Sequence, residues 1–110
     1  MRIIKSINNN YAIAVDDDNN QVVVHGVGIG FGSIPRELED ITVIERSYYD
    51  IDSQYFSMIK DIDEKVISVS TKIVDYIRKE LDVSFNPNLI FVLADHINFS
   101  IEKQKKEYEF

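Results

Sequence analysis

The spacing of apolar residues changes once along the 110-residue chain, and this change divides the chain into two kinds of structure. Before about residue 50, residues 1–7 alternate and later short runs are apolar or rich in β-branched residues, which is typical of β-strands. From about residue 53, apolar residues recur at steps of three and four, the period of an amphipathic helix. The sequence therefore predicts an α+β chain, with an all-β part followed by an all-α part.

The first part contains four predicted strands. They cover residues 1–7, 11–15, 21–25 and 41–46. Polar turn-forming residues at 8–10 and 16–20 separate the first three strands, and such short connections predict an antiparallel sheet. Because four strands in about fifty residues cannot bury much apolar area alone, we expect this sheet to cover one face with a second copy of the chain.

The second part contains two predicted amphipathic helices. The apolar positions of the first are Tyr55, Ile59, Ile62, Val66, Val69, Ile73 and Ile77, and those of the second are Leu89, Val92, Leu93, His96, Ile97, Ser100 and Ile101. Pro87 is expected at the first position of the second helix, where its missing N–H costs nothing. Two helices with one apolar face each do not make a complete domain. The predicted organisation is a domain at 1–50, a linker at 51–54 and an incomplete helical domain at 55–110.

Composition limits the classes of function. The net charge of −7 counts against non-specific phosphate binding, and no DNA partner is expected. The absence of cysteine and the presence of only two histidines argue against disulfides and against zinc or His-rich metal sites. No signal peptide or membrane-spanning run is visible, so a soluble cytoplasmic protein without a cofactor is expected. No nucleophile–base set or carboxylate pair predicts an enzyme.

Residues 25–32 hold all four glycines of the chain, alternating with Val27, Ile29 and Phe31. A dinucleotide-binding turn requires glycines at relative positions 1, 3 and 6 ahead of a helix. The sixth position here is Phe31 or Ser33, which excludes that motif. Two interpretations stay open: a glycine-kinked strand or bulge, and a strip of exposed backbone and apolar side chains that lies against RNA.

The order of these pieces resembles a known family. The turn at 8–10, the Val-rich strand, the glycine strip and the closing Ile44-Glu45-Arg46 resemble the N-terminal RNA-binding domain of BglG/SacY-type transcriptional antiterminators. Residues 93–99, Leu-Ala-Asp-His-Ile-Asn-Phe, look like the first histidine motif of the phosphotransferase-system (PTS) regulation domain that follows it. The resemblance implies a dimeric four-stranded sheet that grips an RNA hairpin in a leader mRNA, so that the overlapping terminator does not form.

The resemblance also implies a set of RNA-binding residues. They are Lys5, Asn10, Gly26, Val27, Gly28, Phe31 and Gly32. Asn10 carries a donor and acceptors that suit a base edge, and Phe31 is able to stack on a base. The alternatives are a plain turn asparagine and a buried core phenylalanine. Valine stands at position 27, where the family usually has arginine or lysine, so phosphate contacts of the family are missing here.

His96 resembles a phosphoacceptor of the regulation domain, phosphorylated by PTS phosphocarrier proteins according to sugar supply. Taken alone, a histidine on an apolar helix face is more often a core residue, and His25 in its strand is interpreted as structural. The leading hypothesis is an RNA-binding antiterminator. The alternative is a dimeric protein-interaction or phospho-sensing module that does not bind RNA.

Overall fold

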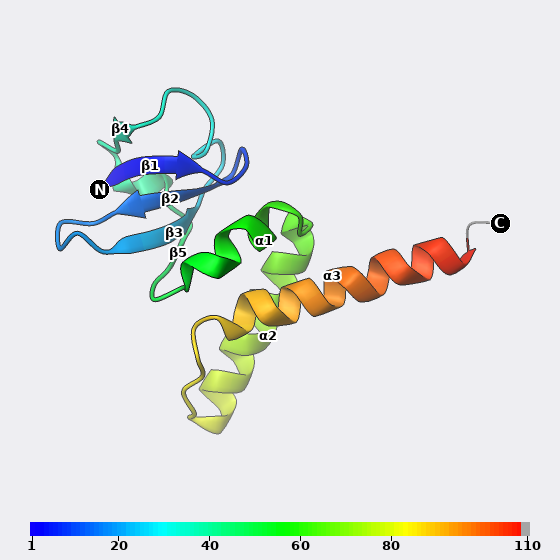
Figure 1. Cartoon of the computed structure of the whole chain (residues 1–110). Helices are drawn as coiled ribbons and strands as arrows, with labels where there is room; N and C mark the ends of the chain where they lie inside the picture. The colour runs from blue at the N-terminus through cyan, green and yellow to red at the C-terminus, as the bar shows by residue number, and fades with distance from the viewer. Residues whose placement is uncertain (109–110) are drawn as a thin grey trace. The chain divides into compact units, whose positions relative to one another are not determined.

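The structure is a computed structural model that describes residues 1–108. The chain divides into two compact units, an N-terminal unit of Met1–Phe56 and a helical unit that begins at Ser57. The first unit is built on a β-sheet and the second on α-helices (Figure 1). This confirms the predicted α+β class and the order of its two parts.

The N-terminal unit contains an antiparallel sheet of five strands rather than the predicted four. The strands are β1 (Arg2–Ser6), β2 (Tyr11–Val15), β3 (Gln21–His25), β4 (Arg36–Glu37) and β5 (Arg46–Tyr48), in the order β4-β1-β2-β3-β5. The first three strands follow the prediction closely. The additional strand, β4, pairs with the start of β1 through Arg2↔Glu37 and Ile3↔Arg36. Two residues are too few for alternation to be visible in a sequence.

The predicted strand at 41–46 is wrong except at its last residue, because the strand in this part of the chain, β5, begins only at Arg46. Ile41–Val43 forms a 3₁₀ turn, and pairing with β3 begins only at Arg46. The cause lies one residue earlier, where the Asp40 side chain accepts a hydrogen bond from the N–H of Thr42 at 3.0 Å. A carboxylate at this position satisfies a backbone donor of a helical turn, and here that local bond outweighs the β-propensity of the residues that follow.

One face of the sheet is covered from within the chain. Its buried residues are Ile3, Ala12, Ala14, Val22, Val24 and Ile29, and the partly buried Met1, Ile34, Leu38 and Ile44 pack against them. Most of these covering side chains come from residues 29–44, the irregular segment between β3 and β5. This face is therefore buried without a second copy of the chain, and dimerisation stays a prediction.

Residues 56–108 form three α-helices rather than the predicted two. They are α1 (Phe56–Lys60), α2 (Glu64–Leu81) and α3 (Leu89–Tyr108). The predicted first helix is interrupted because Asp63 caps a new helix, its side chain accepting from the N–H of Lys65 at 2.8 Å. Pro87 lies before α3 rather than inside it. Asn86 stabilises the turn before this helix, since its side-chain oxygen accepts a hydrogen bond from the N–H of Asn88 at 2.9 Å.

Helices α2 and α3 pack against each other, and the buried positions differ from the predicted ones. Ile59, Ile62 and Val66 are buried as expected. Farther along α2, the buried side chains are Ile67, Ser70, Thr71 and Val74, whereas Val69, Ile73 and Ile77 are exposed. This helix has apolar residues on two neighbouring stripes, so periodicity alone did not decide which stripe faces α3. None of the helices in residues 1–108 has the length and apolar character required to cross a membrane.

Candidate nucleic-acid interface

Two loops far apart in the sequence are joined at one end of the sheet. The turn between β1 and β2 contains Asn9 and Asn10, and the segment after β3 contains the glycines. The N–H of Gly26 donates to the carbonyl of Asn10 at 3.0 Å, and that of Gly30 donates to the carbonyl of Asn9 at 2.9 Å. The N–H of Gly28 donates to the side-chain oxygen of Asn10 at 2.9 Å. We call these joined residues, 8–10 and 26–33, the paired loops.

The first of the paired loops is shaped by Asn8. Its side-chain oxygen accepts from the N–H groups of Asn10 and Tyr11, each at 2.9 Å. The N–H of Ile7 donates to the carbonyl of Tyr11 at 2.9 Å and closes the turn. An asparagine that bonds the backbone two and three residues ahead is a recurrent turn device. Asn8 thereby holds Asn10 in place, a role that the sequence prediction did not assign to it.

The glycine segment is neither a kinked strand nor a bulge. It forms successive turns, in which the N–H of Ile29 donates to the carbonyl of Gly26 at 3.1 Å and that of Phe31 donates to the carbonyl of Gly28 at 3.0 Å. Gly28 has a φ of +74° and Gly32 a φ of +97°, a region that glycine enters without steric cost. The alternation of glycine with apolar residues therefore encodes tight turns rather than an extended strip.

Gly26 and Gly30 are buried and serve the packing of the backbone. A Cβ atom on Gly26 would lie 2.3 Å from the carbonyl oxygen of Val43, and one on Gly30 would lie 1.8 Å from that of Asn8. Gly26 was predicted as an RNA-binding residue, but the close approach of Val43 gives its missing side chain a structural explanation as well. Gly28 and Gly32 are exposed, with open space where a side chain would lie.

The apolar residues of the glycine segment point in opposite directions. Ile29 is 3% exposed and belongs to the core of the sheet. Val27 and Phe31 are 83% and 70% exposed. The alternative interpretation of Phe31 as a core residue is therefore wrong. Two large apolar side chains on a loop held by hydrogen bonds make a surface suited to flat apolar partners such as unstacked bases.

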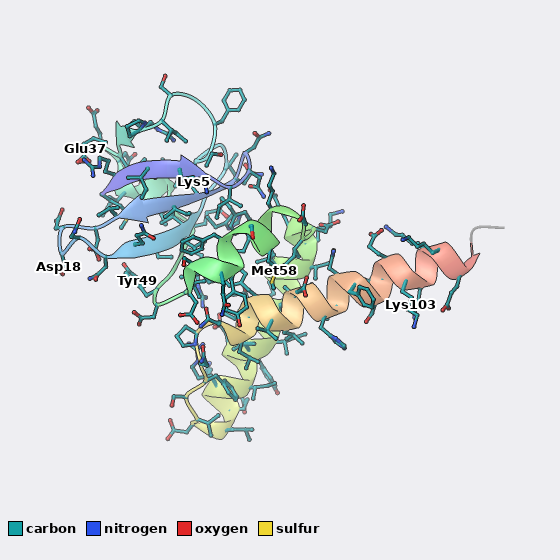
Figure 2. All side chains as sticks on the ribbon, in the orientation of Figure 1. Lys5, Asp18, Glu37, Tyr49, Met58 and Lys103 are labelled. Atoms are coloured by element: carbon teal, nitrogen blue, oxygen red, sulfur yellow. The ribbon has the colours of Figure 1, made fainter. Side chains whose placement is uncertain are left out.

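Few positive charges accompany this surface. Of the four basic residues before position 51, Arg46 lies over the ring of Tyr48, with 5.3 Å from its Cζ atom to the ring centroid. Arg36 donates to backbone carbonyls within the glycine segment. Arg2 lies at the far end of β1, and Lys5 is exposed near the paired loops (Figure 2). Lys5 is thus an exposed basic side chain beside the paired loops, and its contact with a phosphate stays a prediction.

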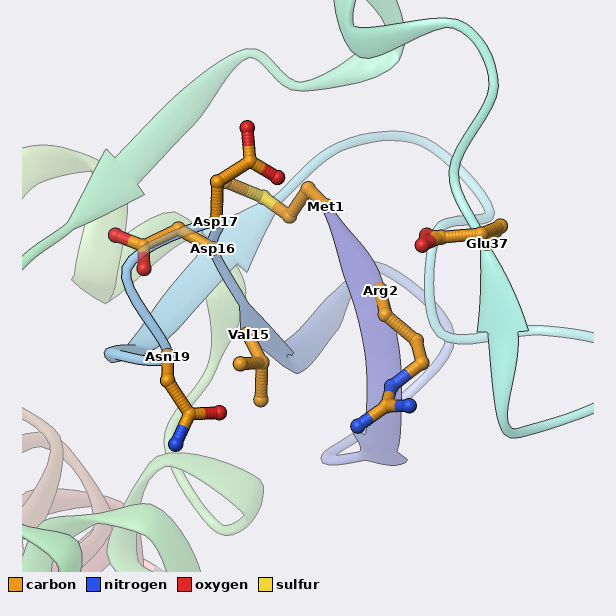
Figure 3. A pocket seen from close by; sticks show the side chains of 7 residues that line it. All are labelled: Met1, Arg2, Val15, Asp16, Asp17, Asn19 and Glu37. Atoms are coloured by element: carbon orange, nitrogen blue, oxygen red, sulfur yellow. The ribbon is translucent and has the colours of Figure 1, made fainter.

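The far end of the sheet carries a small polar hollow of about 170 Å³. It is lined by Met1, Arg2, Val15, Asp16, Asp17, Asn19 and Glu37 (Figure 3). Its three carboxylates oppose a polyanion, so we do not assign RNA binding to this end. Within residues 1–108, no group of three or more His, Cys, Asp or Glu side chains is arranged to hold a metal ion.

The two histidines occupy different surroundings. His25 is stacked on Tyr11 with 4.4 Å between ring centroids, and its Nδ1 atom lies 3.7 Å from an Oε atom of Glu45. This environment agrees with a structural role. His96 is exposed on α3, and its backbone carbonyl accepts from the hydroxyl of Ser100 at 3.0 Å. His96 is therefore not a core residue, and its phosphorylation stays a prediction.

Comparison with known proteins bears on both units. The family model described as CAT RNA binding domain matches residues 1–55. The transcription antiterminator LicT of Bacillus subtilis is 30% identical over 110 residues, covering 96% of this chain and 40% of LicT. A β-glucoside operon antiterminator of Dickeya chrysanthemi is 28% identical, covering 96% of this chain and 39% of its own length. The chain thus spans about two fifths of the length of these relatives.

A solved structure agrees with these matches. The crystal structure of GlcT CAT-PRDI superposes with a TM-score of 0.66 at 28% identity, covering 99% of this chain and 68% of that one. The family is one of RNA-binding regulators rather than enzymes, which confirms the prediction of a non-enzymatic protein. Since the family model accounts for half of the sequence and the resemblance extends to fold, the chain belongs to the CAT RNA binding domain family, as its likeness to BglG/SacY-type antiterminators indicated.

Proposed function

We propose that the chain is part of a transcriptional antiterminator that, as a homodimer, stabilises an antiterminator hairpin in a leader mRNA of the cytoplasm. The observation that carries this proposal is the pair of exposed side chains, Val27 and Phe31, on a loop tied by hydrogen bonds to Asn10. Family membership supports an RNA partner, and the names of the relatives support antitermination. Dimerisation is proposed from the resemblance to the family.

The proposed target is RNA with unpaired or mispaired bases. The major groove of an A-form helix is too narrow for side chains to read, whereas bases in internal loops expose their edges and faces. Phe31 stacks on such a base, Val27 contacts its neighbour, and the Asn10 side chain reads a base edge. Gly28 and Gly32 have no side chain that would keep the RNA away from the backbone. The buried Gly26 packs against the rest of the chain and so supports the loop.

Lys5 is the proposed phosphate contact. Each neutralised phosphate adds about −0.7 to −0.9 to the slope of log K against log salt concentration. A dimer that uses two Lys5 side chains is expected to have a slope of about −1.4 to −1.8. So shallow a slope agrees with a chain of net charge −7 and with valine at position 27.

The helical unit is proposed to be the start of the first PTS regulation domain. The match to GlcT CAT-PRDI extends over this part of the chain and supports the assignment. Exposed His96 would attack the phosphohistidine of a PTS phosphocarrier protein through a ring nitrogen. The phosphoryl group would add negative charge to α3 and shift the balance between active and inactive dimers.

A second candidate function is a dimeric protein-interaction or phospho-sensing module without RNA binding. The acidic net charge favours it because that charge opposes the binding of phosphates, and Val27 favours it because an exposed valine replaces a basic residue of the family. Titration with RNA separates the two. The probe is a short hairpin with mismatches in an internal loop, and the control is a hairpin of the same length with a scrambled sequence.

The titration uses the purified chain at several salt concentrations, with its association state measured by sedimentation. Selective binding by a dimer, with the shallow slope given above, supports the antiterminator. Lys5→Met should flatten the slope further, whereas Arg2→Met, which removes a charge at the far end of β1, should not. Equal and negligible binding of both hairpins by a folded dimer favours the interaction module, once a second mismatched hairpin has given the same result.

A further inference from the structure

The guanidinium of Arg36 lies against the backbone of the glycine segment. Its Nη2 atom donates to the carbonyl oxygen of Ile29 at 2.6 Å, and its Nη1 atom donates to that of Ser33 at 3.4 Å. The backbone of Arg36 belongs to β4, where it pairs with Ile3 of β1. One residue therefore joins the edge of the sheet to two points of the segment that carries Phe31.

Phe31 needs such support because its own side chain makes little packing contact with the rest of the chain. With 70% of its surface exposed, the ring gains little from packing against the chain. The flanking Gly30 and Gly32 also allow the backbone many conformations in the absence of other restraints. The position of Phe31 depends on the burial of Ile29 in the core, on the bond from its own N–H to the carbonyl of Gly28, and on the bonds that Arg36 donates at positions 29 and 33.

We propose that Arg36 is a positioning residue that fixes the loop of Phe31 before RNA arrives, an inference that rests on the proposed function. A planar guanidinium suits this task because it presents several donors in a fixed fork, and hydrogen bonds from a charged donor are stronger than neutral ones. A loop that is already ordered does not lose conformational freedom on binding, and affinity rises accordingly. Arg36 thereby acts on RNA through Phe31 and not through a phosphate.

The alternative role for Arg36 is a phosphate contact, which would replace the arginine or lysine that the family usually has at position 27. The two roles differ in three measurable ways. A phosphate contact contributes to the salt dependence of binding, is largely retained by lysine, and leaves the loop of the unbound protein unchanged. A positioning residue does not contribute to the salt dependence, is poorly replaced by lysine, and alters the loop without RNA.

The test compares Arg36→Met, Arg36→Lys and the control Arg2→Met in the full chain. Amide hydrogen exchange of Phe31 is measured in the unbound protein, and affinity for the mismatched hairpin is measured at several salt concentrations. Arg36→Met should speed exchange of the Phe31 amide and weaken RNA binding, each by about tenfold, with the salt slope unchanged. Arg36→Lys should restore neither property fully, and Arg2→Met should alter neither.

The salt slope of Arg36→Met is compared with that of the unaltered chain. If its magnitude is smaller by about 0.7–0.9 per protomer, Arg36 contacts a phosphate and the inference is overturned. Unchanged Phe31 exchange in both Arg36 variants would overturn it as well. If Arg36→Met does not fold, Arg36→Lys alone decides through the same two measurements. If the unaltered chain binds no RNA, the proposed function fails, and the exchange measurement still decides whether Arg36 orders the loop.

Discussion

The N–H of Gly28 donates a 2.9 Å hydrogen bond to the side-chain oxygen of Asn10, 18 residues earlier in the sequence. This bond joins the residue proposed to read a base edge to the segment that displays Val27 and Phe31. The two loops therefore respond together when either is altered. A substitution at position 10 affects both the chemistry offered to RNA and the geometry of the glycine segment, and these effects are separable.

Asn10→Ala and Asn10→Asp separate them. Alanine removes the acceptor of the Gly28 bond and should lower the stability of the loop by about 1 kcal/mol, measured as faster exchange of the Gly28 amide. Aspartate keeps an acceptor and should leave that exchange slow. Both variants should bind the mismatched hairpin at least about tenfold more weakly, because aspartate loses the donor and adds repulsion from phosphates. Full affinity in Asn10→Asp would contradict a role in reading a base.

Phe31→Ala should weaken RNA binding without unfolding the chain. Stacking of one base on an aromatic side chain contributes about 1–3 kcal/mol, which corresponds to a loss of about 5- to 150-fold in affinity. Because the ring is exposed, the midpoint of thermal unfolding should hardly change. Phe31→Tyr keeps a flat ring and serves as the control that retains affinity. Equal affinities of the alanine and tyrosine variants would show that the ring does not stack.

Gly30→Ala and Gly28→Ala test the two uses of glycine in the segment. The added methyl group at position 30 would lie 1.8 Å from the carbonyl oxygen of Asn8, so the paired loops must move apart. The expected loss in the free energy of unfolding is about 2 kcal/mol or more. At position 28 there is open space, and only the positive φ opposes alanine, at a cost of about 1 kcal/mol. Denaturant unfolding of both variants measures the difference, and the reverse order would contradict this account of the loop.

The parts of the fold that the sequence predicted are those encoded by local pattern. The strands before position 26 are short apolar or β-branched runs between polar turns, and Asn8 to Asn10 form a turn as expected. The errors arose where a single polar side chain overrode a pattern. Asp40 turned an apparent strand into a 3₁₀ turn, and Asp63 divided an apparently continuous helix. Both side chains are carboxylates that cap a helical turn. Such a residue is visible in the sequence, and its hydrogen bond outweighs the apolar spacing of the next three residues.

Residues of the candidate site were predicted from the sequence, but the hydrogen bonds that join them were not. The resemblance singled out Asn10 and Phe31, but the bond from Gly28 that joins their loops spans 18 residues and leaves no local pattern. The packing role of Gly30 and the positioning role of Arg36 were not predicted, because their partners are backbone carbonyls, which are the same at every position of a sequence. Arg36 would otherwise count as a surface charge, and only the structure places its donors on Ile29 and Ser33.

The 3₁₀ turn that follows β4 should respond to acid through Asp40. Hydrogen bonds to the carboxylate, from the hydroxyl of Thr42 at 2.5 Å and from its N–H at 3.0 Å, lower the pKa of Asp40 below its ordinary value of 3.8. Since the pKa is lowered by folding, the stabilisation is complete above the ordinary value and is lost as the pH falls through the folded value. The carboxyl carbon of Asp40, followed by NMR during an acid titration, reports this pKa.

Substitutions at position 42 assign the cause of the shift. The side-chain hydrogen bond is the larger cause, so Thr42→Val should raise the pKa of Asp40 toward 3.8, and the remaining backbone bond should keep it slightly below that value. Thr42→Ser retains a hydroxyl and should leave the pKa low. If serine raised the pKa as much as valine, the hydroxyl would not be responsible. If Asp40 of the unaltered chain titrated at 3.8 or higher, the carboxylate would not cap the turn in solution.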